Sequence, residues 1–436
     1  MRPLIIAESA NPTFVSVPLV GWSHSTAIQR ATGGHIVTQI RNRQDFIDAG
    51  LEEGKDFTAI DSEKVAGRLY RLNTRLRKLG LGWTTTAAIS SISYYYFEKL
   101  AAKHFENQLR NGEFDLVHRV TPLSPTSSSP SFSKVCKKHN IPLIVGPLNG
   151  GVPWPKGYDH IRRAEGEWLS YIRPIYKIMP GSRKTLNTAS AIITGSGATR
   201  SQINAKHHHK CVYIPENAVD PERFEVHSAP RNNPVPQAAF IGRLVPYKGA
   251  EILVRAATKL AKEKKIKVHI FGDGPQMPEL KQLVTDNKLQ DDIILHGWVD
   301  HSDLQNHLRS MDIFAFPSIR EFGGGVVLEA MACGVIPVIV DYAGPGELVD
   351  KDTGFKIPIG SPDELVTAYE KILEQITDNY DALEPMRQTC VQRVKDHFTW
   401  DAKAQKTLRV YEWACGNRNT NPELDDDFST MAPPAE

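Results

Sequence analysis

The sequence predicts an α/β protein built from two doubly wound parallel-sheet lobes that face a cleft. Three observations lead to this prediction: the chain has 436 residues, short apolar stretches alternate with amphipathic ones, and glycine-rich turns follow several apolar stretches. A single core rarely serves more than about 250 to 300 residues, so two lobes are expected. Strands that alternate with helices form βαβ units around a parallel sheet, and ligands then bind at the carboxyl ends of the strands.

The second half of the chain shows this alternation most clearly. Five apolar stretches are expected to be strands, at residues 238–244, 267–272, 293–299, 312–318 and 336–341. Helices are expected between them, at 251–263, 278–287, 302–311 and 326–334. The lengths and apolar periodicities of these segments distinguish strands from helices.

The first half repeats the pattern less cleanly. Its expected strands are at residues 4–8, 35–40, 114–120, 141–146 and 190–195. A helix at about 397–415 is expected to pack back on this half. The predicted domains are an N-terminal Rossmann-like lobe at 1–215, a C-terminal lobe at 216–396, and a disordered acidic tail at 416–436.

Composition and charge restrict the protein class. Residues 1–215 hold 28 lysines and arginines against 15 acidic residues, whereas 216–436 hold 24 against 35, which indicates different partners for the two halves. The five scattered cysteines fit reduced thiols in the cytoplasm better than disulfides or a zinc site. We expect no signal peptide, and no apolar run reaches the roughly 18 to 20 residues of a membrane-spanning helix.

A basic loop follows the strand at 238–244. Gly242 permits a sharp turn, and Arg243 and Lys248 flank a loop that opens a helix. Two cations near a helix N-terminus suit a diphosphate, because guanidinium, ammonium and the helix dipole all attract anionic oxygens. The alternative is a solvated basic turn.

Two glutamates and three glycines form a second candidate site at residues 318–334. Glu321 precedes Gly323, Gly324 and Gly325, and Glu329 follows in the helix expected to begin near Val326. Glycines expose backbone amides to phosphate oxygens, while carboxylates accept hydrogen bonds from sugar hydroxyls. A hydrolase with paired carboxylates is the competing interpretation, and the glycines argue against it.

Two further turns fit the same edge of the sheet. Gly272 and Gly274 end one expected strand, and backbone groups of Trp298 and Val299, after another, could bind the edge of a base. Either turn could equally be an ordinary surface turn.

Residues 238–358 resemble the donor domain of retaining GT-B glycosyltransferases of family 4, the glycosyl transferases group 1. The matching pieces are GRL with KG, GDGP, HGWV, the E-x7-E spacing and LEAMACGVIPVIV. The resemblance implies a GT-B fold, a nucleotide-diphosphate sugar as donor, retention of anomeric configuration, and no cofactor or metal. It would place Arg243 and Lys248 on the diphosphate, Glu329 on the ribose hydroxyls and Glu321 on the sugar, with Glu321, Arg243 and Lys248 as the catalytic residues.

The sequence departs from the family pattern in two places. The family commonly has Glu-x-Phe-Gly, whereas here Phe322 directly follows Glu321. Many members also carry a histidine in the first lobe near the reacting centre, where this chain has Asn149. Asn149 cannot act as a base, so His118 is a candidate for the missing imidazole. A structural role is the alternative for His118.

The acceptor is expected on the first lobe and is predicted to be a glycan or lipid-linked saccharide, as in cell-surface polysaccharide or lipopolysaccharide synthesis. Beside His118 and Asn149, the candidate acceptor-side residues are Gly21, Gly150, Trp154 and Tyr158. The basic stretch 64–78 suggests contact with an anionic membrane, on the inner face of the cell membrane, with a soluble basic surface as the alternative. No nucleic-acid-binding module is recognisable.

Two other motifs have weaker interpretations. His207, His208 and His209 are adjacent and would point in different directions, so a solvated loop is expected rather than a metal site. GSGATR at 195–200 lacks the third glycine of a dinucleotide fingerprint. For the whole chain, the alternatives to a hexosyltransferase are a catalytically silent GT-B partner subunit and, with less support, a GT-B epimerase or phosphorylase.

Overall fold

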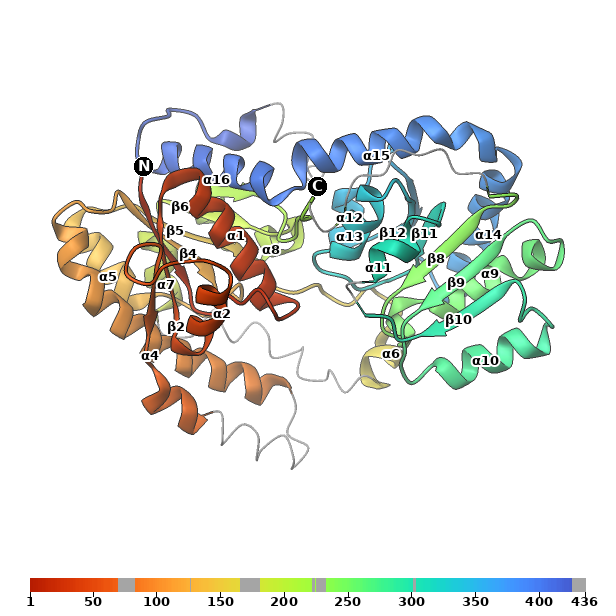
Figure 1. Cartoon of the computed structure of the whole chain (residues 1–436), viewed down its shortest axis with the longest axis horizontal. Helices are drawn as coiled ribbons and strands as arrows, with labels where there is room; N and C mark the ends of the chain where they lie inside the picture. Colours follow the sequence, from red (N-terminus) through yellow and green to blue (C-terminus); the bar gives the residue numbers. More distant parts are fainter. Residues whose placement is uncertain are drawn as a thin grey trace. The chain divides into compact units, whose positions relative to one another are not determined.

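The computed structural model describes residues 1–69, 83–125, 127–164, 181–221, 224, 233–300 and 303–425. The chain divides into two compact units (Figure 1). The first lobe comprises Met1–Gly151, Glu167–Glu216 and Trp400–Glu436, and the second lobe comprises Val152–Gly166 and Asn217–Thr399.

The first lobe contains a parallel sheet in the order β3-β2-β1-β4-β5-β6-β7. Its described strands are β1 (Pro3–Ala7), β2 (His35–Gln39), β3 (Phe57–Ile60), β4 (Leu116–Thr121), β5 (Leu143–Leu148), β6 (Ala191–Thr194) and β7 (Cys211–Tyr213). The strand order reverses between β1 and β4, which is the switch point of a doubly wound sheet.

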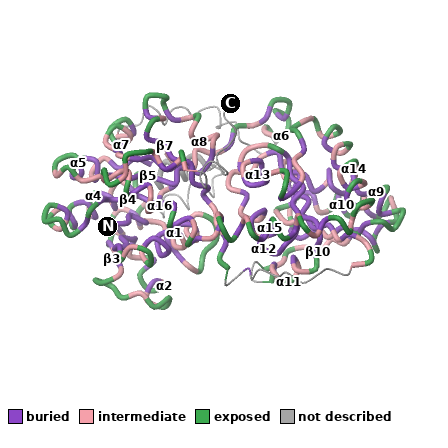
Figure 2. The backbone as a smooth tube through the Cα atoms, turned by 90° about the horizontal axis from the view of Figure 1, so that it is seen from above, coloured by how far each residue is buried: buried purple, intermediate pink, exposed green. Residues whose placement is uncertain are grey.

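Helices cover the first sheet, and their inner faces form the core with the strands (Figure 2). The described helices are α1 (Val17–Thr32), α2 (Arg43–Asp48), α4 (Trp83–Arg110), α5 (Pro130–His139), α7 (Ser182–Thr188), α8 (Gly197–Gln202) and α16 (Trp400–Ala414). Tyr94 and Phe97 of α4 and Phe132 of α5 are almost fully buried in one apolar cluster. Helix α16, from the end of the chain, packs against α1.

The second lobe contains a parallel sheet in the order β10-β9-β8-β11-β12-β13. Its described strands are β8 (Gln237–Ile241), β9 (Lys267–Phe271), β10 (Ile293–Gly297), β11 (Ile313–Phe316), β12 (Ile336–Asp341) and β13 (Phe355–Pro358). Its described helices are α6 (Asp159–Ala164), α9 (Ala250–Lys262), α10 (Met277–Asp286), α11 (Leu304–Leu308), α12 (Gly325–Ala332), α13 (Ala343–Leu348), α14 (Pro362–Asp378) and α15 (Glu384–His397). The switch point lies between β8 and β11.

The predicted α/β class with two doubly wound parallel sheets is confirmed. Each expected strand is present, and β3, β7 and β13 add to them. These three are short, and β7 and β13 lie beside turn residues, which hides their periodicity. Among the described residues, no helix is long and apolar enough to cross a membrane.

One segment of the first half belongs to the second lobe, in contrast to the predicted boundary at residue 215. The segment Val152–Gly166 clusters with Asn217–Thr399. Arg320 Nε donates to the Val152 carbonyl at 3.3 Å, and the Tyr342 hydroxyl donates to the Pro153 carbonyl at 3.1 Å. These bonds hold the segment on the second lobe.

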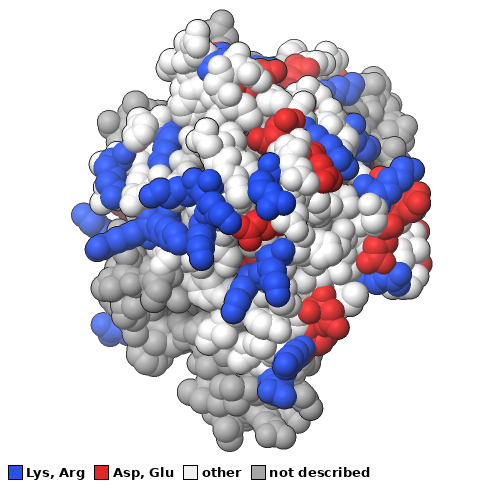
Figure 3. Space-filling model, turned by 90° about the vertical axis from the view of Figure 1, so that its left-hand side faces the viewer, with Lys and Arg blue, Asp and Glu red and all other residues white. Residues whose placement is uncertain are grey.

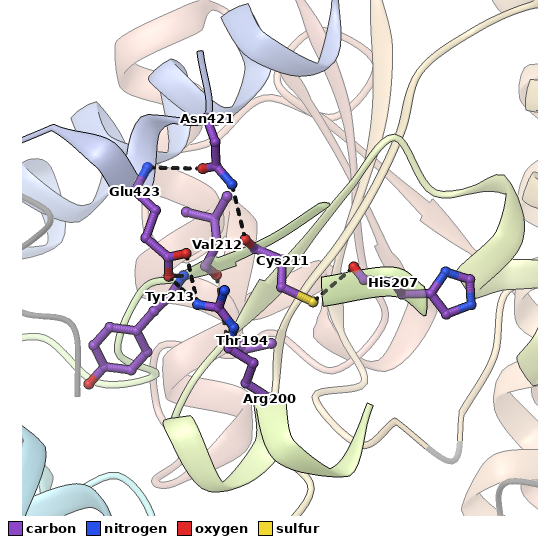
Figure 4. A network of polar contacts seen from close by, with 8 residues as sticks. All are labelled: Thr194, Arg200, His207, Cys211, Val212, Tyr213, Asn421 and Glu423. Carbon is purple, nitrogen blue, oxygen red and sulfur yellow. Dashed lines mark hydrogen bonds and ion pairs between the residues drawn. The ribbon is translucent and has the colours of Figure 1, made fainter. Parts of the chain in front are cut away.

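The predicted disorder of the tail is wrong for residues 416–425. A short 3-10 helix, η6 (Pro422–Leu424), lies beside edge strand β7 (Figure 4). The Glu423 carboxylate accepts from Arg200 at 2.7 Å and from the Tyr213 backbone N–H at 2.9 Å. The Glu423 side chain is thus fixed here because it accepts from the Arg200 guanidinium and from a backbone N–H of edge strand β7, which has no neighbouring strand on that side. Residues 426–436 lie outside the described residues.

Candidate functional site

The carboxyl ends of β8 and β11 lie side by side at the switch point of the second lobe. A 3-10 helix, η4 (Pro246–Lys248), and Gly249 connect β8 to α9. Gly249 has a φ of 78°, and a Cβ there would lie 2.6 Å from the carbonyl oxygen of Pro317, which follows β11. Glycine therefore lets the two loops touch, and this contact brings Lys248 to the residues after β11.

Lys248 and Glu321 form an ion pair at this point. Their side chains retain 17% and 23% of their exposure, so both are largely shielded and still reachable. The ammonium of Lys248 also lies 5.1 Å from the ring centroid of Phe316, within the range of a cation–π interaction. The structure thus brings together two residues that are 73 positions apart in sequence.

Arg243 lies on the same loop as Lys248. Its side chain is exposed, and within the described residues it forms neither an ion pair nor a hydrogen bond. A guanidinium left in this state has all five N–H donors available for an anion. Gly242, directly before it, donates its backbone N–H to the Phe271 carbonyl at 3.0 Å and so holds the loop to β9.

The glycine run leads into α12. Gly324 is the N-cap residue of α12, with a φ of 55° and no side-chain cap, and Gly325 and Val326 form the first turn. The N–H groups of a first helical turn have no partner within the helix, so this end of α12 can bind an anion. Glu329 lies further along α12 and is half-buried. The glycine amides predicted for phosphate oxygens and the glutamates predicted for sugar and ribose hydroxyls therefore lie on one short segment, while Arg243 and Lys248 come from the loop after β8.

The first turn of helix α13 fixes the Glu321–Gly323 segment. Gly344 donates its N–H to the Glu321 carbonyl at 3.3 Å. A Cβ on Gly344 would lie 1.8 Å from the Phe322 carbonyl oxygen, so only glycine permits this approach. The backbone of Phe322, the shifted aromatic residue, is thus packed closely against Gly344.

The turn glycines at 272 and 274 have a structural explanation. A Cβ on Gly272 would lie 1.9 Å from the Gly242 carbonyl oxygen, and one on Gly274 would lie 2.5 Å from the Leu244 carbonyl oxygen. Close packing of two loops thus requires both glycines, with or without a ligand. Trp298 is 75% exposed after β10 and Val299 is half-buried, so their predicted contact with a base stays a prediction.

His118 is a structural residue, and its proposed role as the missing imidazole is wrong. It is fully buried inside β4, not at the end of the strand. Its Nδ1 lies 2.6 Å from the Tyr411 hydroxyl and its Nε2 lies 2.8 Å from the Gly146 carbonyl oxygen. Burial lowers the pKa of His118 to about 3. Both ring nitrogens are occupied, and a buried ring cannot reach an acceptor.

Asn149 also has partners within the first lobe. Its amide nitrogen donates to the Glu216 carboxylate at 2.6 Å, and its oxygen accepts from the Gly151 N–H at 2.9 Å. Lys403 of α16 donates to the Glu216 carbonyl, and burial lowers the pKa of Lys403 to about 7. Asn149, directly after β5, is therefore bound to Glu216 at the end of the segment Glu167–Glu216, and its amide is not free.

The other acceptor-side candidates are distributed over both lobes. Gly21 lets α1 approach the loop after β1, because a Cβ there would lie 2.2 Å from the Ser9 carbonyl oxygen. Gly150 donates its N–H to the Thr199 hydroxyl at 2.9 Å. Tyr158 is 3% exposed and donates to the Gly360 carbonyl in the second lobe, so its expected stacking on an acceptor sugar is wrong.

Trp154 likewise belongs to the second lobe, beside the predicted donor loops. The ring centroids of Trp154 and Tyr247 lie 5.9 Å apart in an edge-to-face arrangement, and the Arg320 guanidinium lies 4.8 Å from the Trp154 ring. Tyr247 and Arg320 directly precede Lys248 and Glu321. Arg320 and Tyr247 were not identified from the sequence as neighbours of this site. Their positions directly before Glu321 and Lys248 could have indicated it.

The histidine run differs from a solvated loop. His207, His208 and His209 lie in the 3-10 helix η3 (Ala205–Lys210), and His207 is buried, which lowers its pKa to about 4. No group of metal-binding side chains is found in the part of the chain that the structure describes. Of the basic stretch 64–78, residues 70–78 lie outside that part.

Known proteins share this architecture and part of this sequence. Residues 222–393 match the family model described as glycosyl transferases group 1. One phosphatidylinositol N-acetylglucosaminyltransferase subunit of Arabidopsis thaliana is 29% identical over 212 residues, which cover 48% of this chain and 46% of that protein. The chain thus spans less than half the length of the curated relatives it matches.

Two solved structures match nearly the whole fold. The glycosyltransferase from Rickettsia africae ESF-5 has a TM-score of 0.61 at 15% identity, covering 96% of this chain and 99% of that one. The Anabaena protein HepE, in complex with UDP, has a TM-score of 0.58 at 16% identity, covering 94% and 100%. These likenesses confirm the predicted GT-B fold.

Proposed function

We propose that this chain is a glycosyltransferase that transfers a hexose from a nucleotide-diphosphate sugar to a glycan or lipid-linked saccharide. The observation that carries the proposal is the meeting of Lys248 and Glu321 beside the uncapped start of α12. The match of residues 222–393 to group 1 glycosyl transferases supports it. The UDP bound to the similar Anabaena protein supports a nucleotide as part of the donor.

The residues of this site suit loss of a diphosphate. As the bond between the sugar and the diphosphate breaks, negative charge grows on the leaving phosphate oxygens. Arg243, Lys248 and the N–H groups at the start of α12 would stabilise that charge in the role that a metal ion has elsewhere. Glu321 and Glu329 would accept hydrogen bonds from hydroxyls of the sugar and the ribose.

The proton of the acceptor needs a destination in this reaction. His118 and Asn149 are engaged within the first lobe, and neither supplies a base. We infer that a leaving phosphate oxygen takes the acceptor proton on the face where the new bond forms. Such a reaction retains the anomeric configuration and needs no dedicated base.

The test is binding and turnover of a panel of nucleotide sugars by the intact chain. We expect one of them to bind and to be hydrolysed slowly in the absence of acceptor. Lys248→Ala and Glu329→Ala should weaken its binding by roughly 10-fold or more, since each removes a charged hydrogen-bonding group. The proposal fails if no nucleotide sugar binds.

A silent partner subunit is the second candidate function. It is favoured by one observation, the absence of a reachable imidazole at His118. Binding of a nucleotide sugar with no turnover against any saccharide acceptor would support it.

We also propose contact between the first lobe and an anionic membrane. Exposed lysines and arginines occupy the adjacent helices α4, α5 and α7, at Lys99, Lys103, Arg110, Lys134, Lys137, Lys138, Arg183 and Lys184. Figure 3 shows Lys and Arg side chains gathered on the face that it views. Sedimentation with phosphatidylglycerol vesicles, and not with phosphatidylcholine vesicles, is the expected result.

A further inference from the structure

The side chain of Asn217 lies directly over the glycine run that begins α12. Asn217 is the residue at which the chain enters the second lobe after Glu216. Its Nδ2 lies 2.2 Å from the position that a Cβ on Gly323 would occupy, and 3.3 Å from the corresponding position on Gly325. A carboxamide is therefore held against the loop that carries the proposed phosphate-binding amides.

The carboxamide of Asn217 has no partner of its own. Within the described residues, neither its nitrogen nor its oxygen forms a hydrogen bond, and the residue is half-buried. It does not cap α12 either, since that helix has no side-chain cap. A half-buried amide that satisfies nothing in its own lobe has both N–H groups available for a ligand.

The neighbouring glycines are required for different reasons. Gly324 has a φ of 55°, which other residues rarely adopt. Gly323 has no such backbone requirement, and a side chain there would instead overlap the Asn217 amide. The absence of a side chain at Gly323 thus leaves space for the Asn217 amide, so a substitution at one of these residues should affect the other.

We propose that Asn217 is a donor-binding residue whose amide N–H donates to the diphosphate held at the Gly323–Gly325 loop. This inference rests on the proposed function, because it needs a diphosphate at the start of α12. Asn217 adds a neutral donor to the cations Arg243 and Lys248 on that ligand.

The experiment is to measure the binding of UDP, GDP and ADP to the intact chain by calorimetry. The nucleotide that binds most tightly is then used to measure the affinity of each variant. Asn217→Ala should weaken binding by roughly 10- to 100-fold, the range for a hydrogen bond to a charged group. Asn217→Asp should weaken it further, since a carboxylate repels the diphosphate. The control Asn306→Ala, at an exposed position on α11, should bind as the parent does.

The outcomes separate this inference from the proposed function. If the parent chain binds none of the three nucleotides, the proposed function fails. If the parent binds one and Asn217→Asp binds it equally well, Asn217 does not touch the diphosphate, and the inference is overturned. Weaker binding by Asn217→Ala with parent-like binding by Asn217→Asp would also overturn it, because the shape of the side chain alone would then support the loop.

A double-mutant cycle with Gly323 tests the contact itself. Gly323→Ala should weaken nucleotide binding by displacing the Asn217 amide. In the Asn217→Ala background the same substitution should cost less, because the overlapping atom is gone. Equal effects in both backgrounds would show that the two residues are independent and would overturn the proposed geometry.

Discussion

The two lobes use polar residues near their strand ends in different ways. In the first lobe, His118 and Lys403 are buried, and the half-buried Asn149 donates to the Glu216 carboxylate. In the second lobe, Arg243 is exposed, and the pair of Lys248 and Glu321 remains partly exposed. Both lobes have the same doubly wound architecture. Location at a switch point therefore does not by itself make a polar residue functional; its partners decide whether it can bind a ligand.

Helix α16 explains much of the difference. It supplies the Tyr411 hydroxyl to His118, the Lys403 ammonium to the Glu216 carbonyl, and the Thr407 hydroxyl, 3.2 Å from His24 Nε2. A helix from the end of the chain thus satisfies buried polar groups of the first lobe. Substitutions in the first lobe's network should therefore change stability, and substitutions in the second lobe's pair should change turnover.

The largest effect is expected for Glu321→Gln. The substitution removes the charge that pairs with Lys248 and accepts from the sugar, so turnover should fall by roughly 100-fold or more. Release of nucleotide diphosphate from the donor measures it. The control Glu374→Gln removes the partner of Lys259 in an exposed pair of the same lobe and should leave turnover unchanged. Parent-like turnover by Glu321→Gln would mean that the pair is structural.

The next effect concerns stability of the first lobe. His118→Phe leaves the Tyr411 hydroxyl and the Gly146 carbonyl without partners, which should lower the free energy of unfolding by about 1–3 kcal/mol. Urea denaturation followed by circular dichroism measures this loss, and nucleotide binding should persist. His104→Phe, at an exposed position on α4, serves as the control. Loss of turnover at unchanged stability would restore a chemical role for His118.

The pH dependence of stability follows from the same residue. Burial lowers the pKa of His118 to about 3, and the nearby charges of Arg119 and Lys403 act in the same direction. Below its ordinary pKa of about 6.5, the unfolded chain binds a proton that the folded chain does not, so stability falls as pH decreases toward 3. Between pH 7 and pH 4, the midpoint temperature of thermal unfolding should fall less steeply in His118→Phe than in the parent chain. An unchanged slope would contradict the assignment.

The smallest effect is expected at the end of the chain. Glu423→Gln keeps an acceptor for the Tyr213 N–H and removes the charge that faces Arg200, so the unfolding free energy should drop by about 1 kcal/mol or less. Asp401→Asn, which breaks a largely exposed pair with Arg30, should have no measurable effect. A large loss of turnover in Glu423→Gln would mean that the first lobe's polar groups also serve the reaction.

Part of the candidate site could be predicted from sequence. The loops at 241–249 and 318–334 are short and local, so their glycines, cations and carboxylates indicated a phosphate and sugar site directly. Asn217 could not be found this way, because its place over Gly323 depends on a contact across more than a hundred positions of the chain. Trp154 and Tyr158 were placed in the wrong lobe, since the crossing of Val152–Gly166 leaves no local mark.

The sequence by itself determined the α/β class, most strands of both sheets and the two motif loops, because these follow from periodicity and from residues close together in the chain. The tertiary structure decided which polar groups are buried and which remain reachable. His118 and Tyr411 are 293 positions apart, and their hydrogen bond converts a candidate base into part of the core. Burial and hydrogen-bond satisfaction are properties of distant contacts, so they appear only when the chain is folded.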